Sequence, residues 1–185
     1  MAGSWKKVAK RIRVPLGFIF AALYLWFARP GWQFVALSLL LVIPGLLLRG
    51  YASGYVKKNA ELTVTGPYAY TRNPLYLGSM LIAFGFALAA RNVWIGAALV
   101  ALFIAIYIPV IRGEEEYLRS VFPGFDEYAA RVPRLLPRLT PATPAENGSG
   151  GFQSSLYRKH REYNALIGAA ALYLALLLRL YSLHL

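Results

Sequence analysis

The sequence contains no cysteine, so the chain has no disulfide bond, no thiolate metal ligand and no cysteine nucleophile. Its two histidines, His160 and His184, lie too far from each other and from the main acidic segment to form a recognisable metal site. We expect ordinary surface roles for both. No serine stands in the sequence context of a nucleophile elbow. The sequence therefore predicts neither a bound metal nor a covalent nucleophile of these kinds.

Acidic residues are also scarce. The chain has 8 Asp and Glu against 20 Lys and Arg, which gives a formal net charge of +12. In a nucleic-acid binder, such cationic residues would form a patch on a polar fold. Here 58% of the residues are hydrophobic, the mean hydropathy is +0.47, and the cationic residues cluster at the ends of apolar runs. This pattern indicates an integral membrane protein and argues against a nucleic-acid partner.

Several apolar segments follow one another along the chain, each with polar or basic flanks. Some are shorter than the roughly 20 residues that a perpendicular helix needs, although aromatic and basic flanks extend their reach. The first has a basic front like a signal peptide, but it lacks a small-x-small cleavage site, and "RPGW" after it indicates a tight helical hairpin. We therefore predict an all-α fold, a multi-pass transmembrane bundle with helices near residues 14–28, 34–48, 75–90, 93–111 and 165–178.

The distribution of Lys and Arg predicts the orientation of this bundle. Most of them lie in the N-terminal arm, in residues 49–72 and in residues 112–161. By the positive-inside rule these segments face the cytoplasm, together with the N-terminus, and the C-terminus lies on the far side. Residues 112–139 are expected to form a cytoplasmic helical cap. Arg179, at the end of the last apolar segment, can extend its side chain toward the membrane surface.

A segment of low complexity divides the chain. Residues 140–152 are rich in Pro, Gly, Ser and Asn, which cannot bury enough apolar area to order a chain. We predict a flexible linker here, between a membrane core of residues 1–139 and a C-terminal extension of residues 153–185. The extension either packs against the core helices or forms a homodimer contact. No Rossmann fingerprint is present, so a nucleotide-like cofactor would need another kind of site.

The first unusual motif is "GPYAYTRNPLYLGS", residues 66–79. Its Gly-Pro and Asn-Pro pairs predict turns, and Pro74 suits the first turn of the third membrane helix. The tyrosines are also typical of an aromatic belt at the level of the lipid headgroups. Arg72 is harder to explain in that way, because a guanidinium near the membrane surface forms a fork for carboxylate or phosphate.

The second motif, residues 111–137, holds five of the eight acidic residues and begins where the fourth helix leaves the membrane. Pro109 is expected to kink that helix just before the motif. Three consecutive glutamates project about 100° apart on a helix, so they cannot all face one pocket. A solvated helix start with acids favoured by the dipole would explain the charges. It would not explain the interleaved aromatics, which predict an amphipathic cap: Tyr117, Phe122, Phe125 and Tyr128.

Together the two motifs resemble the isoprenylcysteine carboxyl methyltransferase family, and more distantly the phospholipid N-methyltransferases and sterol reductases. The resemblance covers roughly residues 61–137 and rests on Gly66-Pro67-Tyr68, on Arg72-Asn73-Pro74-Leu75-Tyr76-Leu77-Gly78, on residues 111–118 and on Val132-Pro133-Arg134. It implies a multi-pass membrane enzyme that uses S-adenosylmethionine without a Rossmann domain.

The resemblance also implies which residues form the site. Relatives often have His where this chain has Asn73, and Asn cannot titrate near neutrality, so we expect no proton transfer there. The site residues that the resemblance implies are Arg72, Glu115 and Arg134 for catalysis, and Tyr68, Asn73, Pro74, Tyr76, Gly78, Glu114, Glu115 and Tyr128 for the cofactor.

The resemblance leaves several functions open. The first is carboxyl O-methylation of a lipid-like or prenylated acceptor at the cytoplasmic membrane interface. Phospholipid amine N-methylation and an NADPH-dependent membrane reduction are the alternatives among enzymes. A non-catalytic membrane scaffold or transport subunit is the alternative of another class. Transporters usually place ionisable residues inside their spans, and these apolar segments hold almost none, which favours an interfacial enzyme.

Overall fold

The computed structural model describes residues 2–57, 60–142 and 151–182, and over these ranges it is helical without any β-strand. The prediction of an all-α membrane fold is confirmed. Most of the predicted linker and His184 lie outside the described residues.

The chain divides into two compact units. Unit 1 comprises residues 1–42, 83–116 and 169–185, and unit 2 comprises residues 43–82 and 117–168. Several helices contribute residues to both units, so we describe the contacts of each unit separately. The division into a core, a linker and a C-terminal extension stays a prediction.

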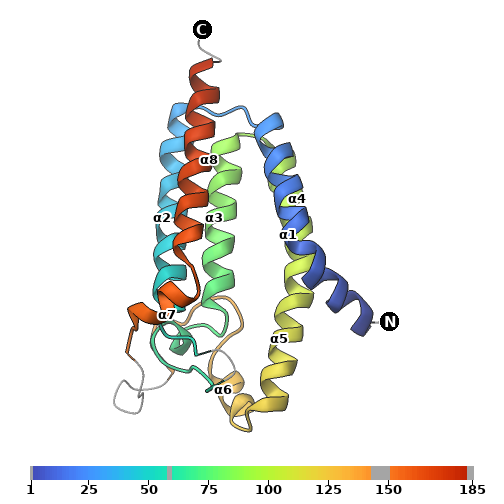
Figure 1. Cartoon of the computed structure of the whole chain (residues 1–185), viewed down its shortest axis with the longest axis vertical. Coiled ribbons are helices and arrows are strands. Elements are labelled where there is room, and N and C mark those ends of the chain that lie inside the picture. Colours follow the sequence, from blue (N-terminus) through green and yellow to red (C-terminus); the bar gives the residue numbers. More distant parts are fainter. Residues whose placement is uncertain (1, 58–59, 143–150, 183–185) are drawn as a thin grey trace. The chain divides into compact units, whose positions relative to one another are not determined.

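The main helices occupy the five apolar segments that the sequence predicts (Figure 1). Helices long and apolar enough to cross a membrane span Trp32–Ser53, Val93–Val121 and Tyr163–Ser182, and shorter apolar helices span Pro15–Phe27 and Pro74–Ala90. The full set is α1 (Ala2–Phe27), α2 (Trp32–Ser53), η1 (Gly66–Ala69), α3 (Pro74–Ala90), α4 (Val93–Leu102), η2 (Phe103–Tyr107), α5 (Ile108–Val121), α6 (Phe125–Arg131), α7 (Ser154–Lys159) and α8 (Tyr163–Ser182).

Proline explains the irregular places in these helices. Pro109 has no amide hydrogen, so it cannot donate to the carbonyl of Ala105 as an α-helix requires. The residues just before it form the π-helix η2 instead, which accommodates the missing bond and marks the predicted disturbance of this helix. Pro15 lies inside α1, which bends in its N-terminal half (Figure 1).

In unit 1, aromatic side chains join the helices. The Tyr24 hydroxyl donates to the carbonyl of Phe86 at 2.8 Å, and the Phe86 ring lies 4.7 Å from the ring of Tyr173, measured between centroids. The Tyr173 hydroxyl is 2.7 Å from the hydroxyl of Ser38, which lies on α2 and is fully buried. The C-terminal helix α8 therefore packs against other helices of its own chain, as one of the two predicted alternatives requires.

Arg179 makes a second contact of this kind. Its guanidinium donates to the carbonyls of Leu25 and Trp26, the latter at 2.8 Å. These carbonyls lie in the last turn of α1, where the helix dipole places partial negative charge. Arg179 thus caps a neighbouring helix, whereas the sequence predicted only that its side chain extends to the membrane surface.

Candidate active site

The turn that carries Arg72 is shaped by glycine and proline, as the sequence predicts. Gly66 has φ +58°, and a Cβ atom added there would lie 2.5 Å from the Tyr55 ring, so only glycine fits. Pro67 is the second residue of η1, and Pro74 begins α3 and is fully buried. This turn, residues 66–74, is therefore a defined structure with Arg72 half-buried just before the third helix.

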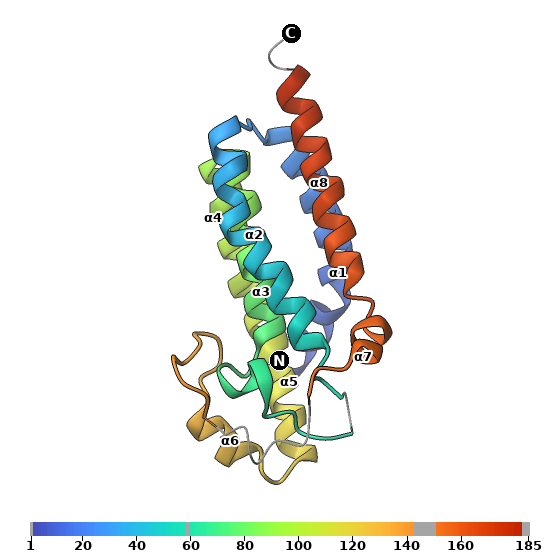
Figure 2. The ribbon, with the colours of Figure 1, turned by 90° about the vertical axis from the view of Figure 1, so that its left-hand side faces the viewer.

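Residues of the second motif fold back onto this turn within unit 2. Phe125, Tyr128 and Val132 form a buried cluster, with Leu118 and other apolar side chains packed against it. The Tyr128 hydroxyl donates to the carbonyl of Tyr68 at 2.8 Å, which fixes the middle of α6 to η1. Figure 2 shows α6 and the turn at the same end of the unit.

The chain after α6 then pairs with the arginine turn through its backbone. The Arg72 amide donates to the carbonyl of Pro133 at 2.9 Å. The Asn73 side-chain amide donates to the carbonyl of Arg134 at 3.1 Å, and the Thr71 hydroxyl donates to the same carbonyl at 3.2 Å. The structure thus brings together the first motif and the C-terminal half of the second.

These contacts give structural tasks to residues that the resemblance assigned to the cofactor. Asn73 holds the returning chain through its side-chain amide, which suits a neutral residue at this position. The Tyr128 hydroxyl is likewise engaged with backbone. Direct contacts of these two residues with a cofactor stay predictions.

Gly78 has a packing explanation. A Cβ atom at Gly78 would lie 2.7 Å from the carbonyl oxygen of Gly45, and one at Gly45 would lie 2.7 Å from the carbonyl oxygen of Gly78. Both distances are too short for real side chains, so this part of α2 and α3 needs two glycines to pack. A role of Gly78 in cofactor binding is a separate prediction that this contact does not require.

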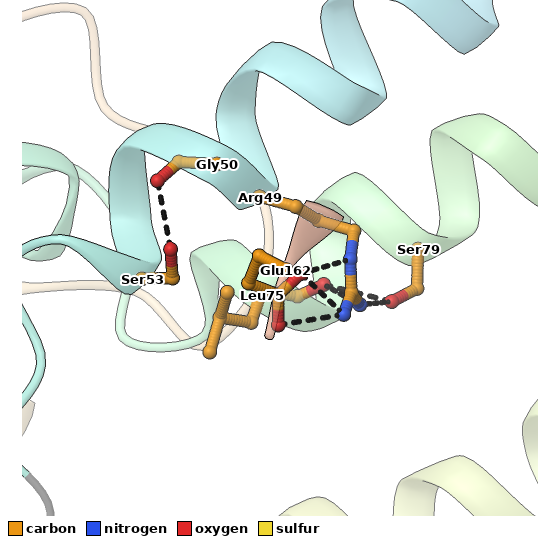
Figure 3. Close-up of polar contacts among 6 residues, drawn as sticks. All are labelled: Arg49, Gly50, Ser53, Leu75, Ser79 and Glu162. Carbon is orange, nitrogen blue, oxygen red and sulfur yellow. Dashed lines mark hydrogen bonds and ion pairs between the residues drawn. The ribbon is translucent and has the colours of Figure 1, made fainter. Parts of the chain in front are cut away.

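A polar cluster that the sequence did not predict lies beside this glycine contact (Figure 3). Arg49, near the end of α2, pairs with both carboxylate oxygens of Glu162, with nitrogen–oxygen distances of 2.8, 3.0 and 3.1 Å. Its Nη1 atom also donates to the carbonyl of Leu75 at 3.3 Å and to the hydroxyl of Ser79. From the sequence Arg49 looked like a flanking cation, because its partner is 113 residues away.

The acidic triplet, residues 114–116, lies in unit 1, and its three side chains differ in burial. Glu115 is only 4% exposed, whereas Glu114 and Glu116 are exposed. All three are in the middle of α5, so they do not begin a helix, and favourable contact with a helix N-terminus does not explain them. Glu115 is therefore the glutamate of the triplet that faces away from solvent. The side chain of Arg134 is exposed. That Glu115, Arg72 and Arg134 act together in catalysis stays a prediction.

The described residues include no group of three or more His, Asp or Glu side chains that could hold a metal ion. The ring of His160 lies 3.0 Å, through Nε2, from the carbonyl oxygen of Val56. His160 thus connects the C-terminal end of α7 to the segment that follows α2.

Comparison with known proteins finds one matching family model and two similar proteins. Residues 34–124 match the family model described as phospholipid methyltransferase. The chain is 34% identical over 139 residues to the cobalt-zinc-cadmium resistance protein CzcN of Cupriavidus metallidurans, covering 69% of this chain and 62% of that protein. It is 39% identical over 90 residues to the nickel-cobalt-cadmium resistance protein NccN of Alcaligenes xylosoxydans xylosoxydans, covering 49% of this chain and 41% of that protein.

The matched part of the chain therefore spans less than two thirds of either relative. The comparison with solved structures gave no match. The family match includes both the arginine turn and the acidic triplet, and it ends before Tyr128 and Arg134. Residues 34–124 are thus similar to the phospholipid methyltransferase family, and they lie in a helical membrane fold.

Proposed function

We propose that this chain is an S-adenosylmethionine-dependent methyltransferase that acts on a lipid-like or prenylated acceptor at the cytoplasmic face of the membrane. The observation that carries the proposal is the hydrogen-bonded junction between the arginine turn and the chain after α6. This junction holds Arg72 half-buried at the end of a membrane helix, where a charged ligand can meet an amphiphilic acceptor.

The chemistry of the available side chains fits S-adenosylmethionine. Its methionine part carries a carboxylate and an ammonium group, and a guanidinium such as that of Arg72 binds a carboxylate in a bidentate way. Glu115 offers a buried carboxylate for the ammonium group or for ribose hydroxyls. Tyr68 and Tyr76 offer aromatic faces, which attract cations such as a sulfonium.

When bound, S-adenosylmethionine supplies an electrophilic methyl group that a nucleophile displaces in line. The residues of the chain then have to position the acceptor, because near-attack distances of about 3–3.5 Å supply much of the rate. For a carboxylate acceptor, charge is lost in the transition state, and a pocket that excludes water favours this change. We assign the orientation of the acceptor carboxylate to Arg134.

Because a pocket that excludes water favours this loss of charge, we propose carboxyl O-methylation as the reaction. Methylation of a phospholipid amine is the second candidate, because the matching family model is described as phospholipid methyltransferase. In that case a glutamate of the triplet, Glu114 or Glu115, would act as general base. The cationic segments that flank the spans support a cytoplasmic location of the proposed reaction, by the positive-inside rule.

Methyl-labelled S-adenosylmethionine tests the proposal. Membranes that contain the protein should transfer label into an organic-extractable product, whereas membranes that contain the Arg72→Ala variant should not. Base treatment then separates the two candidates, because a methyl ester releases its label as methanol and an N-methyl group does not. Absence of any protein-dependent label in the extract would contradict the proposed function.

A further inference from the structure

We propose that Glu162, in the C-terminal extension, is a positioning residue for the methyltransferase site, acting through Arg49 on the start of α3. This inference rests on the proposed function. Glu162 lies outside residues 34–124, so nothing in the family match assigns it a role. All contacts that carry the argument lie within unit 2.

The first step is the strength of the ion pair. Arg49 meets both oxygens of Glu162, and the exposed fractions of the two side chains are 23% and 11%. A bidentate guanidinium–carboxylate pair with this burial is directional as well as charged, so it sets the plane of the guanidinium. Figure 3 shows this group directed from α2 toward both Glu162 and α3.

The second step is the contact of the Arg49 guanidinium with α3. The Nη1 atom donates to the carbonyl of Leu75 and to the hydroxyl of Ser79, which itself donates to the carbonyl of Leu75 at 2.8 Å. Leu75 is the second residue of α3 and follows Pro74 directly. Arg49 thus clamps the first turn of the helix whose preceding residues are Arg72 and Asn73.

The third step is that the clamp has little freedom. A Cβ atom at Gly78 would lie 2.7 Å from Cγ of Arg49, so the stem of Arg49 runs closely along the glycine contact of α2 and α3. If Glu162 lost its charge, the half-buried guanidinium would have to find solvent or another acceptor. It would then leave the carbonyl of Leu75, and the arginine turn would lose its hold on the α3 side.

The fourth step is that the backbone presents Glu162 to α2. Arg161 has φ +53°, an uncommon conformation for a non-glycine residue, in the short turn that joins α7 to α8. His160 anchors the same turn to the carbonyl of Val56 at 3.0 Å. The extension therefore presents a carboxylate from a defined turn.

The experiment compares Glu162→Gln with Glu162→Asp and with the control Glu61→Gln, all in the full-length protein. Glu61 pairs with Lys57 in an i,i+4 ion pair, and its own side chain is 49% exposed, so its substitution removes the same charge without touching α3. Hydrogen exchange of residues 66–79, the Michaelis constants for S-adenosylmethionine and for the acceptor, and the thermal midpoint are measured for each.

We expect Glu162→Gln to speed exchange in residues 66–79 and to raise KM for S-adenosylmethionine about tenfold. KM for the acceptor should stay unchanged, Glu162→Asp should retain most of the affinity, and Glu61→Gln should resemble the wild type. Simple loss of folded protein would instead lower the apparent kcat and leave both KM values unchanged. If Glu162→Gln leaves both the exchange and the KM for S-adenosylmethionine at wild-type values, the inference is wrong.

The two proposals can fail separately. A wild-type protein that neither binds nor uses S-adenosylmethionine overturns the proposed function. The exchange of residues 66–79 then still decides whether Glu162 holds the turn. Should Glu162→Gln reduce stability too far for kinetics, Glu162→Asp provides the exchange comparison at a temperature well below its midpoint.

Discussion

At the scale of single residues, burial distinguishes the three consecutive glutamates, which the sequence alone could not do. Glu115 is buried, and its two neighbours point outward. A buried carboxylate is costly unless it is matched by donors or cations, so the burial of Glu115 makes it the first candidate of the triplet for a role in the site.

The substitution Glu115→Gln keeps the size of the side chain and removes its charge. We expect it to weaken S-adenosylmethionine binding by about 1.5–3 kcal/mol, the usual contribution of hydrogen bonds to a charged group. Glu116→Gln, at an exposed position of the same helix, is the control and should bind like the wild type. Equal affinity of both variants in a calorimetric titration would remove Glu115 from the site.

Tyr128→Phe removes a single hydroxyl that holds α6 to η1. We expect a loss of about 1 kcal/mol in the free energy of unfolding, because the carbonyl of Tyr68 is left without this donor inside a buried cluster. Tyr181→Phe, at a side chain that is 65% exposed, is the matched control. Thermal unfolding in detergent measures both, and equal midpoints would show that the Tyr128 bond has no net effect.

At the scale of secondary-structure elements, helices α2 and α3 approach each other through glycine. Gly78→Ala would place a Cβ atom 2.7 Å from a backbone oxygen, so we expect it to cost about 1–3 kcal/mol of stability. Gly96→Ala, where a Cβ atom meets nothing within 4 Å, should be neutral or stabilising. A Gly78→Ala variant as stable as the wild type would contradict the close packing.

The sequence predicted the existence of these helices well and their ends less well. Apolar runs and prolines mark the five segments because membrane helices need both length and hydrophobicity. The second helix nevertheless continues past the predicted end at residue 48 to Ser53. Arg49, which looked like the polar end of a span, is accommodated there by Glu162 and stays in the helix.

In the candidate site, too, the sequence predicted the local structure but not the contacts between distant residues. The turn chemistry of Gly66, Pro67 and Pro74 is local, so the sequence predicted it. The pairing of Arg49 with Glu162 depends on tertiary structure across 113 residues, and no short pattern encodes it. The engagement of Asn73 with a backbone carbonyl is equally non-local.

At the scale of the whole molecule, the orientation predicted from the cationic segments can be tested directly, because the chain has no cysteine of its own. We expect Ser120→Cys, in the predicted cytoplasmic region, to react with an impermeant maleimide only in inverted vesicles. Trp94→Cys, at a position that is 79% exposed and predicted on the far side, should react only in right-side-out vesicles. The opposite pattern would invert the topology.

The central claim concerns the methyl donor, and a calorimetric titration of the detergent-purified protein tests it most directly. S-adenosylmethionine should bind with saturable heat, whereas NADPH should give only the heat of dilution, because we propose a methyltransferase rather than a reductase. Saturable binding of NADPH with no response to S-adenosylmethionine would contradict the claim.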